Sequence, residues 1–289
     1  MKRLLTLLAA TVVALCPLES SAKKIHTIGD STMANYDESR TVTRGWCQYL
    51  QKFLKDIEVN NRGKAGSSTR SFYLGERFWP TVKEQMEPGD YLLIQFAHND
   101  EKNNGMDGDE VKAYLTERGD TLEAPGNYRG TNPSTTYKEY LRKYVDETRA
   151  LGCEPIFVGP ICRMYFAGDS IRRNGRHDLG DNFSVLTSGG ILENQSVPAS
   201  DRTMDYVQSM KDIAAEKGVP FVDLTSATAD LYLSYGDEPC HTALGDGAGS
   251  THLSETGATR IARLFVEVAS RAGILSEYAD LPDERSVVR

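Results

Sequence analysis

The alternation of short apolar runs with longer segments of helical periodicity constrains the fold of this 289-residue chain most strongly. The runs are rich in β-branched and aromatic residues, and they predict strands at 25–28, 57–60, 91–96, 155–158 and 220–222. The apolar spacing predicts helices at 46–55, 135–151, 204–217 and 254–271. Strands separated by crossover helices form a parallel sheet covered on both faces. The chain is therefore expected to form one doubly wound α/β domain.

Two connections in this pattern are much longer than the loops usual in compact domains. They span 101–133 and 163–202, and both are rich in Gly, Asn, Asp and Ser. Loops of this length are either functional walls and lids or disordered segments. Because ligands bind at the carboxyl ends of parallel strands, we expect insertions there within a single domain over 23–289.

The first 22 residues are predicted to form a secretory signal. A basic start precedes an apolar stretch that ends at Leu15, and residues 20–22 supply the small side chains of a cleavage site. The stretch is shorter than the roughly 20 apolar residues of a transmembrane helix. Cys16 leaves a lipid anchor as an alternative, although Leu15 stands where lipoprotein cleavage sites prefer a small residue. We expect a secreted or periplasmic protein.

The charge and cysteine content narrow the classes of partner. With 33 basic and 41 acidic residues the chain has a net charge of −8 at pH 7, which favours neither nucleic acid nor a membrane surface as partner. We expect a monomer. The cysteines after the signal match no zinc-binding spacing, so disulfides and buried thiols are both open; these residues are Cys47, Cys153, Cys162 and Cys240.

A serine lies where the first predicted strand passes into a turn, in the string Gly29-Asp30-Ser31-Thr32. A serine hydroxyl is a poor nucleophile at neutral pH, so this site needs a base and oxyanion donors. His252 is the candidate base, because it lies in a small-residue loop directly before the last predicted helix.

Two other loops provide candidate oxyanion donors. Gly66 follows the second predicted strand, and its backbone N–H can approach a ligand closely because glycine has no side chain. Asn99 follows the third strand and offers a neutral amide donor. Taken alone, Gly66 also suits a tight turn, and Asn99 could cap the next segment.

In this order, the motifs resemble the SGNH, or GDSL-type, hydrolase superfamily. Ser31, Gly66, Asn99 and His252 match its four signature residues one by one. The resemblance implies a three-layer α/β/α sandwich around a five-stranded parallel, flavodoxin-like sheet, with no cofactor and no metal. It also implies that Ser31 attacks an ester while His252 takes its proton. The N–H groups of Ser31 and Gly66 and the Asn99 side chain then hold the oxyanion.

Finer details look most like the rhamnogalacturonan acetylesterases. They are the string from Ala65 to Phe72, the triplet His98-Asn99-Asp100 and the segment 252–258. This branch implies a serine esterase that removes O-acetyl groups from a plant polysaccharide, with rhamnogalacturonan first and xylan or another glycan as the alternative. The expected partner is an acetylated polysaccharide or oligosaccharide.

The resemblance fails at the acid that orients the histidine. The family places this acid three residues before the histidine, where this chain has Gly249. Asp246 is the preferred substitute because its glycine-rich loop could fold back to accept the imidazole N–H. The alternatives are Asp237, Glu238 or a Ser-His dyad oriented by a backbone carbonyl.

Substrate-binding candidates are the polar residues on the same loops. Arginine binds uronate carboxylates bidentately, although solvated loop charges are an equal alternative. The candidates are Arg70, His98, Arg163, Arg172, Arg173, Arg176 and His177. The aromatic residues between 72 and 79, and Tyr165, are candidates for sugar stacking or for the core.

Two other classes of function stay open. The glycine at 249 allows a carbohydrate-binding protein that has lost turnover. A metallophosphoesterase is a weaker alternative, because the order Ala97-His98-Asn99-Asp100 differs from the Gly-Asn-His-Asp arrangement of such metal sites.

Overall fold

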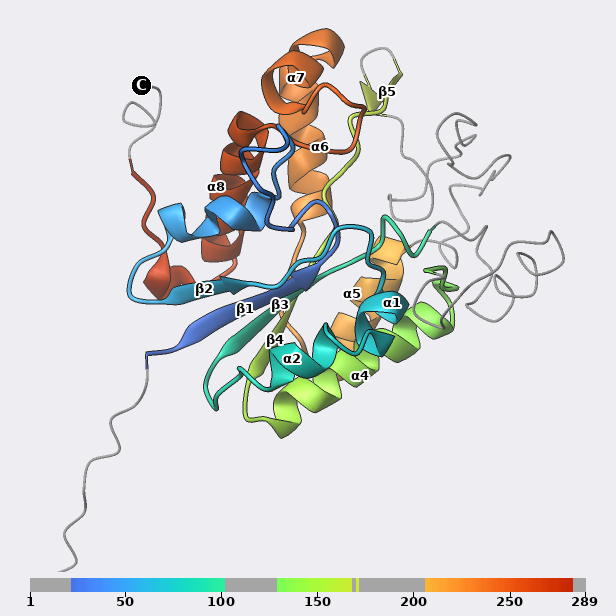
Figure 1. Ribbon diagram of the computed structural model, residues 1–289, viewed down its shortest axis with the longest axis vertical. Helices are drawn as coiled ribbons and strands as arrows, with labels where there is room; N and C mark the ends of the chain where they lie inside the picture. The colour runs from blue at the N-terminus through green and yellow to red at the C-terminus, as the bar shows by residue number, and fades with distance from the viewer. Residues whose placement is uncertain (1–21, 102–128, 168–169, 172–205, 283–289) are drawn as a thin grey trace, which may run out of the picture.

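The computed structural model describes residues 22–101, 129–167, 170–171 and 206–282 (Figure 1). The predicted signal, apart from its last residue, lies outside these residues, and so does most of both predicted insertions. Within the described part of the chain, no helix combines the length and apolar content needed to cross a bilayer.

The sheet has five parallel strands in the order β2-β1-β3-β4-β7. The strands are β1 (Lys24–Gly29), β2 (Glu58–Asn61), β3 (Tyr91–Gln95), β4 (Glu154–Val158) and β7 (Phe221–Val222). This is the flavodoxin-like strand order, so the predicted fold class is confirmed. A short antiparallel pair, β5 (Phe166–Ala167) with β6 (Ser170–Ile171), lies outside the sheet.

Helices cover both faces of the sheet (Figure 1). One face carries η1 (Trp46–Phe53), α6 (Leu224–Tyr235), α7 (Asp237–Leu244) and α8 (Glu255–Arg271). The other carries α1 (Thr69–Leu74), α2 (Trp79–Lys83), α4 (Thr136–Ala150) and α5 (Tyr206–Lys217). A short 3₁₀ turn, η4 (Ser276–Tyr278), follows α8.

Alternate residues of the central strands enter different cores, because side chains of a strand point to opposite faces. In β3, Leu93 packs in the core under α8, whereas Leu92 and Ile94 pack in the core under α4. Burial on both faces explains why these strands read as continuous apolar runs.

The structure adds helices that the sequence did not predict. The helices α1 and α2 have six and five residues, too few to show helical periodicity. α1 begins at a capping box in which Ser68 and Ser71 exchange hydrogen bonds, rather than the more familiar Ser-x-x-Glu pattern. The segment 46–53 is a 3₁₀ helix, not the predicted α-helix.

The four described cysteines are buried free thiols. Burial raises the pKa of the Cys47 thiol well above its ordinary value and that of Cys153 to about 11. The sequence left disulfides and buried thiols as alternatives, and for these four cysteines the structure shows buried thiols.

Candidate active site

Ser31 follows β1 in a turn that Asp30 closes. The Asp30 carboxylate accepts hydrogen bonds from the N–H and the hydroxyl of Thr32, both at 2.8 Å. The hydroxyl of Tyr36 donates to the carbonyl oxygen of Ser31 at 2.9 Å. The backbone is therefore held on both sides of Ser31, while the serine side chain keeps partial exposure.

His252 meets Ser31 at the carboxyl end of the sheet. Its Nε2 lies 2.9 Å from Ser31 Oγ, the distance required for proton transfer. The next residue, Leu253, forms antiparallel bridges with Arg44 and Gly245, which anchor the histidine loop. Ser31 and His252 are 221 positions apart in the chain, and the fold brings them together.

The position of α8 behind His252 depends on a glycine. Ser254 caps the helix by accepting a hydrogen bond from the Gly257 N–H. A Cβ atom at Gly257 would lie 2.1 Å from the carbonyl oxygen of Leu244, closer than any real contact. Glycine at this position lets the first turn of α8 pack against the end of α7.

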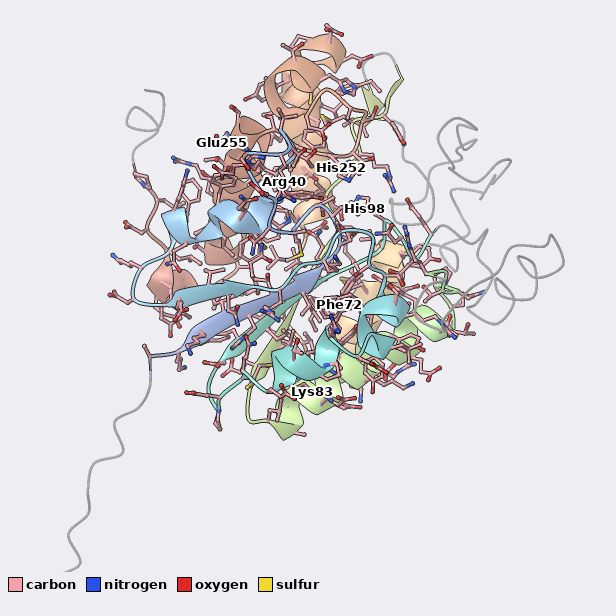
Figure 2. All side chains as sticks on the ribbon, viewed as in Figure 1. Arg40, Phe72, Lys83, His98, His252 and Glu255 are labelled. Carbon is pink, nitrogen blue, oxygen red and sulfur yellow. The ribbon has the colours of Figure 1, made fainter. Side chains whose placement is uncertain are left out.

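A second histidine, His98, contacts Asp30 in the turn that carries Ser31. His98 Nδ1 lies 3.0 Å from Asp30 Oδ2, and both side chains are buried. Burial alone would raise the pKa of Asp30, but the charge and hydrogen bond of His98 and the bonds from Thr32 lower the pKa below its usual value. Figure 2 shows His98 and His252 at the same end of the sheet.

A hydrogen bond joins the two candidate oxyanion loops, which carry Gly66 and Asn99. Gly66 occupies the third position of a turn closed by the Ser67 N–H and the Lys64 carbonyl at 3.1 Å, and its φ of 81° favours glycine. The Asn99 side chain donates from Nδ2 to the Ser67 carbonyl at 2.9 Å. This bond places the Asn99 amide beside the turn that carries Gly66.

Asp100 fixes the base of these loops. Its buried carboxylate accepts hydrogen bonds from the Thr69 N–H at 3.0 Å, from the Thr69 hydroxyl and from the Thr131 hydroxyl at 2.8 Å. Burial raises the pKa of Asp100 to about 7 despite these bonds. Asp100 thus joins the start of α1 to the segment that precedes α4.

The structure does not place Asp246 as expected. Its carboxylate accepts hydrogen bonds from the Thr43 hydroxyl at 2.7 Å and the Ala248 N–H at 2.9 Å. Its own N–H donates to the His252 carbonyl oxygen at 3.2 Å. Among the described residues, the Asp246 carboxylate makes no hydrogen bond with the His252 ring. The acid is near the site, but its hydrogen bonds hold the loop.

The alternative acids lie elsewhere. Asp237 and Glu238 belong to the first turn of α7, and Asp237 Oδ1 lies 3.5 Å from His241 Nε2. The identity of the residue that orients His252 remains a prediction.

The substrate candidates separate into three groups. The side chains of His98 and Arg163 are 3% and 7% exposed, which corrects the expectation that they contact a sugar. Arg70 is half-buried in the first turn of α1. The remaining candidates lie outside the described residues; they are Arg172, Arg173, Arg176 and His177.

The aromatic candidates are mainly core residues. Phe72 and Trp79 are each 1% exposed, and the Trp79 ring packs edge-on against Tyr144. Figure 2 shows Phe72 on the α1 side of the sheet, away from His252. Tyr73 directs its hydroxyl to Glu147 on α4.

Arg163 is a site residue whose role the sequence did not reveal. It follows β4, where the sequence suggested a substrate-binding arginine or a solvated loop charge. Its Nη1 donates to the Thr251 hydroxyl at 2.5 Å, and its Nη2 donates to the His98 carbonyl at 3.3 Å and to the Glu101 carboxylate. The guanidinium therefore links the loop of His252 to the loop of Asn99.

Arg129 is a second residue that sequence reasoning missed. It is exposed, and its Nη1 donates to Asn99 Oδ1 at 3.3 Å. No motif marks it, because it lies at the end of a long polar insertion, far in sequence from the residues it contacts.

Known proteins resemble this chain in sequence and in fold. A model of the GDSL-like lipase/acylhydrolase family matches residues 27–260. A rhamnogalacturonan acetylesterase of Bacillus subtilis is 30% identical over 266 residues, which cover 87% of this chain and 91% of that protein. A rhamnogalacturonan acetylesterase of Emericella nidulans is 34% identical over 272 residues, 92% of each chain.

A solved structure provides a further similarity, in fold alone. An acetylxylan esterase from Geobacillus stearothermophilus has a TM-score of 0.51 and 22% identity, and the match covers 86% of this chain and 94% of that chain.

Proposed function

The chain belongs to the GDSL-like lipase/acylhydrolase family, and we propose that it is a secreted serine esterase whose substrate is acetylated rhamnogalacturonan. It is a carbohydrate acetylesterase, a carboxylic ester hydrolase. One observation carries the chemistry: the 2.9 Å contact between Ser31 Oγ and His252 Nε2, beside the loops of Gly66 and Asn99.

The reaction follows from these positions. Ser31 Oγ attacks the acetyl carbonyl carbon and its proton passes to His252 Nε2. The carbonyl oxygen becomes an oxyanion, which accepts hydrogen bonds from the N–H groups of Ser31 and Gly66 and from the Asn99 amide. His252 returns the proton to the departing sugar oxygen, which leaves an acetyl group on Ser31.

Water completes the cycle. His252 takes a proton from a water molecule as that water attacks the acetyl-serine carbonyl. The second oxyanion uses the same donors, and its collapse releases acetate and restores the Ser31 hydroxyl. No step of this sequence needs a cofactor.

Two observations support the substrate and the location. The two relatives of 30% and 34% identity are both named rhamnogalacturonan acetylesterases. The basic, apolar and small-residue pattern of residues 1–22 supports export, because such segments direct secretion. A soluble monomer outside the cytoplasm would meet a polysaccharide that cannot enter the cell.

The serine mechanism is tested by combining a labelling reaction with product release. Wild-type protein should react with a fluorophosphonate probe and release acetate from acetylated rhamnogalacturonan. Ser31→Ala should lose both, whereas Ser276→Ala, in the remote η4 turn, should retain both. Acetate release by Ser31→Ala at the wild-type rate would refute the mechanism.

The substrate is tested on the same wild-type protein. Release from acetylated xylan but not from rhamnogalacturonan would assign the other glycan. Tight glycan binding without any acetate release would instead indicate a binding protein on a hydrolase fold.

A further inference from the structure

Arg129 lies directly against both of the assigned oxyanion loops. Its Nη1 donates to Asn99 Oδ1 at 3.3 Å. A Cβ atom built on Gly66 would lie 3.6 Å from Arg129 Cζ and 3.7 Å from each terminal nitrogen. Because these three distances are nearly equal, the flat face of the guanidinium lies over Gly66.

The charge of Arg129 has no counter-ion in the described part of the protein. Half-buried basic residues on the helices, such as Arg142 and Lys217, pair with Glu216 and Asp146. Among the described residues, Arg129 makes no ion pair, and it is exposed to solvent.

The adjacent loop extends this positive charge. Lys64 begins the turn that carries Gly66, and its Nζ lies 6.0 Å from the centre of the Phe78 ring. Arg62 donates from Nη2 to the Thr81 hydroxyl at 3.3 Å. Neither Arg62 nor Lys64 has a carboxylate partner within the ranges that the structure describes. The loop after β2 is therefore basic where it borders the oxyanion donors.

The small size of an acetyl group makes this placement informative. When its carbonyl oxygen is bound between Gly66 and Asn99, the sugar is only two bonds from the carbonyl carbon, through the ester oxygen. The sugar that carries the ester must then lie beside Arg129. Arginine presents a fork of N–H donors that matches a carboxylate, and a neutral sugar offers no such partner.

We propose that Arg129 is the binding site for a sugar carboxylate, on the acetylated residue or on its neighbour. The proposal rests on the proposed function, because it requires an acetyl carbonyl held by Gly66 and Asn99. It makes the acidic backbone of a uronate-containing polysaccharide the preferred substrate over a neutral glycan. Lys64 and Arg62 supply weaker, longer-range attraction along the same loop.

The test compares one acetylated rhamnogalacturonan oligosaccharide with the form in which its galacturonate carboxylates are methyl-esterified and uncharged. For wild-type protein, kcat/KM for acetate release should be about tenfold higher on the charged form, as expected for one charge-assisted hydrogen-bonded pair. This ratio should fall at high salt, because the site is exposed.

Variants of Arg129 separate the charge from the contact with Asn99. Arg129→Gln keeps an amide group at this position and should lower kcat/KM mainly on the charged form, so that the ratio falls to about one. Arg129→Lys should keep part of the preference, since a lysine is a point charge without the fork. Arg271→Gln is the matched control, because Arg271 lies at the far end of α8, about 25 Å along the helix from Ser254.

Each other outcome has a clear meaning. An unchanged ratio in Arg129→Gln would overturn the proposal. An equal loss on both forms with the ratio retained would also overturn it, because Arg129 would then act only through Asn99. If wild-type protein releases no acetate from either form, the proposed function fails, a result that differs from the loss of a charge preference.

Discussion

At the scale of single residues, the carboxylate near His252 is the feature that distinguishes this site. Asp246 is bound by the Thr43 hydroxyl and the Ala248 N–H, and its backbone bonds to His252. A carboxylate held in this way stabilises the histidine loop. It does not directly select the imidazole tautomer, as the aspartate of a serine-protease triad does.

We expect Asp246→Asn to lower kcat by about tenfold, the effect of weakening one charge-assisted hydrogen bond. Thr43→Val removes the same contact from its other side and should produce a similar loss. Steady-state kinetics on a neutral acetyl ester measures both. A loss near 10⁴-fold in Asp246→Asn alone would restore Asp246 as the triad acid.

At the scale of elements, three loops meet at one buried ion pair. Arg163, from the segment after β4, contacts the loop of His98 and Asn99 and the loop of Thr251 and His252. Its partner Glu101 lies in the segment after β3, and both side chains are at most 10% exposed. The Met164 N–H also donates to the Ser250 carbonyl at 2.7 Å. The ion pair therefore sets the position of the loop that carries the catalytic base, His252, relative to the loop that carries the oxyanion donor Asn99.

Arg163→Met should destabilise the protein by about 3 kcal/mol, because the buried Glu101 carboxylate loses its ion pair with the guanidinium. It should also lower kcat with little change in KM, since the loop of His252 loses the hydrogen bond from Arg163 to the Thr251 hydroxyl. Urea unfolding and steady-state kinetics on a neutral acetyl ester measure the two effects.

The double variant Arg163→Met with Glu101→Met separates these effects. It should recover most of the stability, because no charge remains buried, while kcat stays low. Recovery of kcat together with stability would show that the ion pair serves folding alone.

At the scale of the whole molecule, Asp100 couples stability to pH. The pKa of this buried carboxyl is raised to about 7, whereas an unfolded aspartate has a pKa of about 3.9. Between these values the folded state binds the proton and the unfolded state does not. The contribution of Asp100 to the free energy of unfolding is therefore fully present below about pH 4 and is lost as pH rises towards 7.

Asp100→Asn should remove this dependence. Its free energy of unfolding should change less between about pH 4 and 7 than that of the wild type, although its overall stability falls because hydrogen bonds to Thr69 and Thr131 weaken. Asp146→Asn is the control, since the Asp146 side chain is 58% exposed, and should keep the wild-type slope. The pKa of Asp30 is lowered, so this carboxyl changes the free energy of unfolding only in more acidic solution. Parallel slopes for wild type and Asp100→Asn would contradict this account.

Much of the architecture was predictable because it depends on local pattern. The run at 155–158 is apolar throughout and the run at 91–96 is apolar except for Gln95, a pattern typical of strands buried on both faces. Each predicted strand lies within about two residues of an observed one, and the parallel order confirms the fold class. The short helices α1 and α2 were missed because their stability comes from packing against α4 rather than from their own periodicity.

The candidate site also contains residues that the sequence predicted and residues that it did not. The positions of Ser31, Gly66 and Asn99 follow from the rule that parallel strands bring the residues after them to one edge. His252 was found from its small-residue loop before the last helix, and the structure brings it to Ser31 at the same edge. Arg163 and Arg129 carried no such signal, because each contacts residues at least 30 positions away.

By itself, the sequence determined the sheet, its burial on both faces and the residues that lie at its carboxyl edge, since periodicity and strand ends are local properties of the chain. Only the tertiary structure decided which charges are used and how. It buried Arg163 with Glu101, turned Asp246 towards Thr43 and placed the exposed Arg129 beside Gly66 with no counter-ion among the described residues. The role of a charged side chain depends on burial and partners, and these are set by segments far apart in the chain.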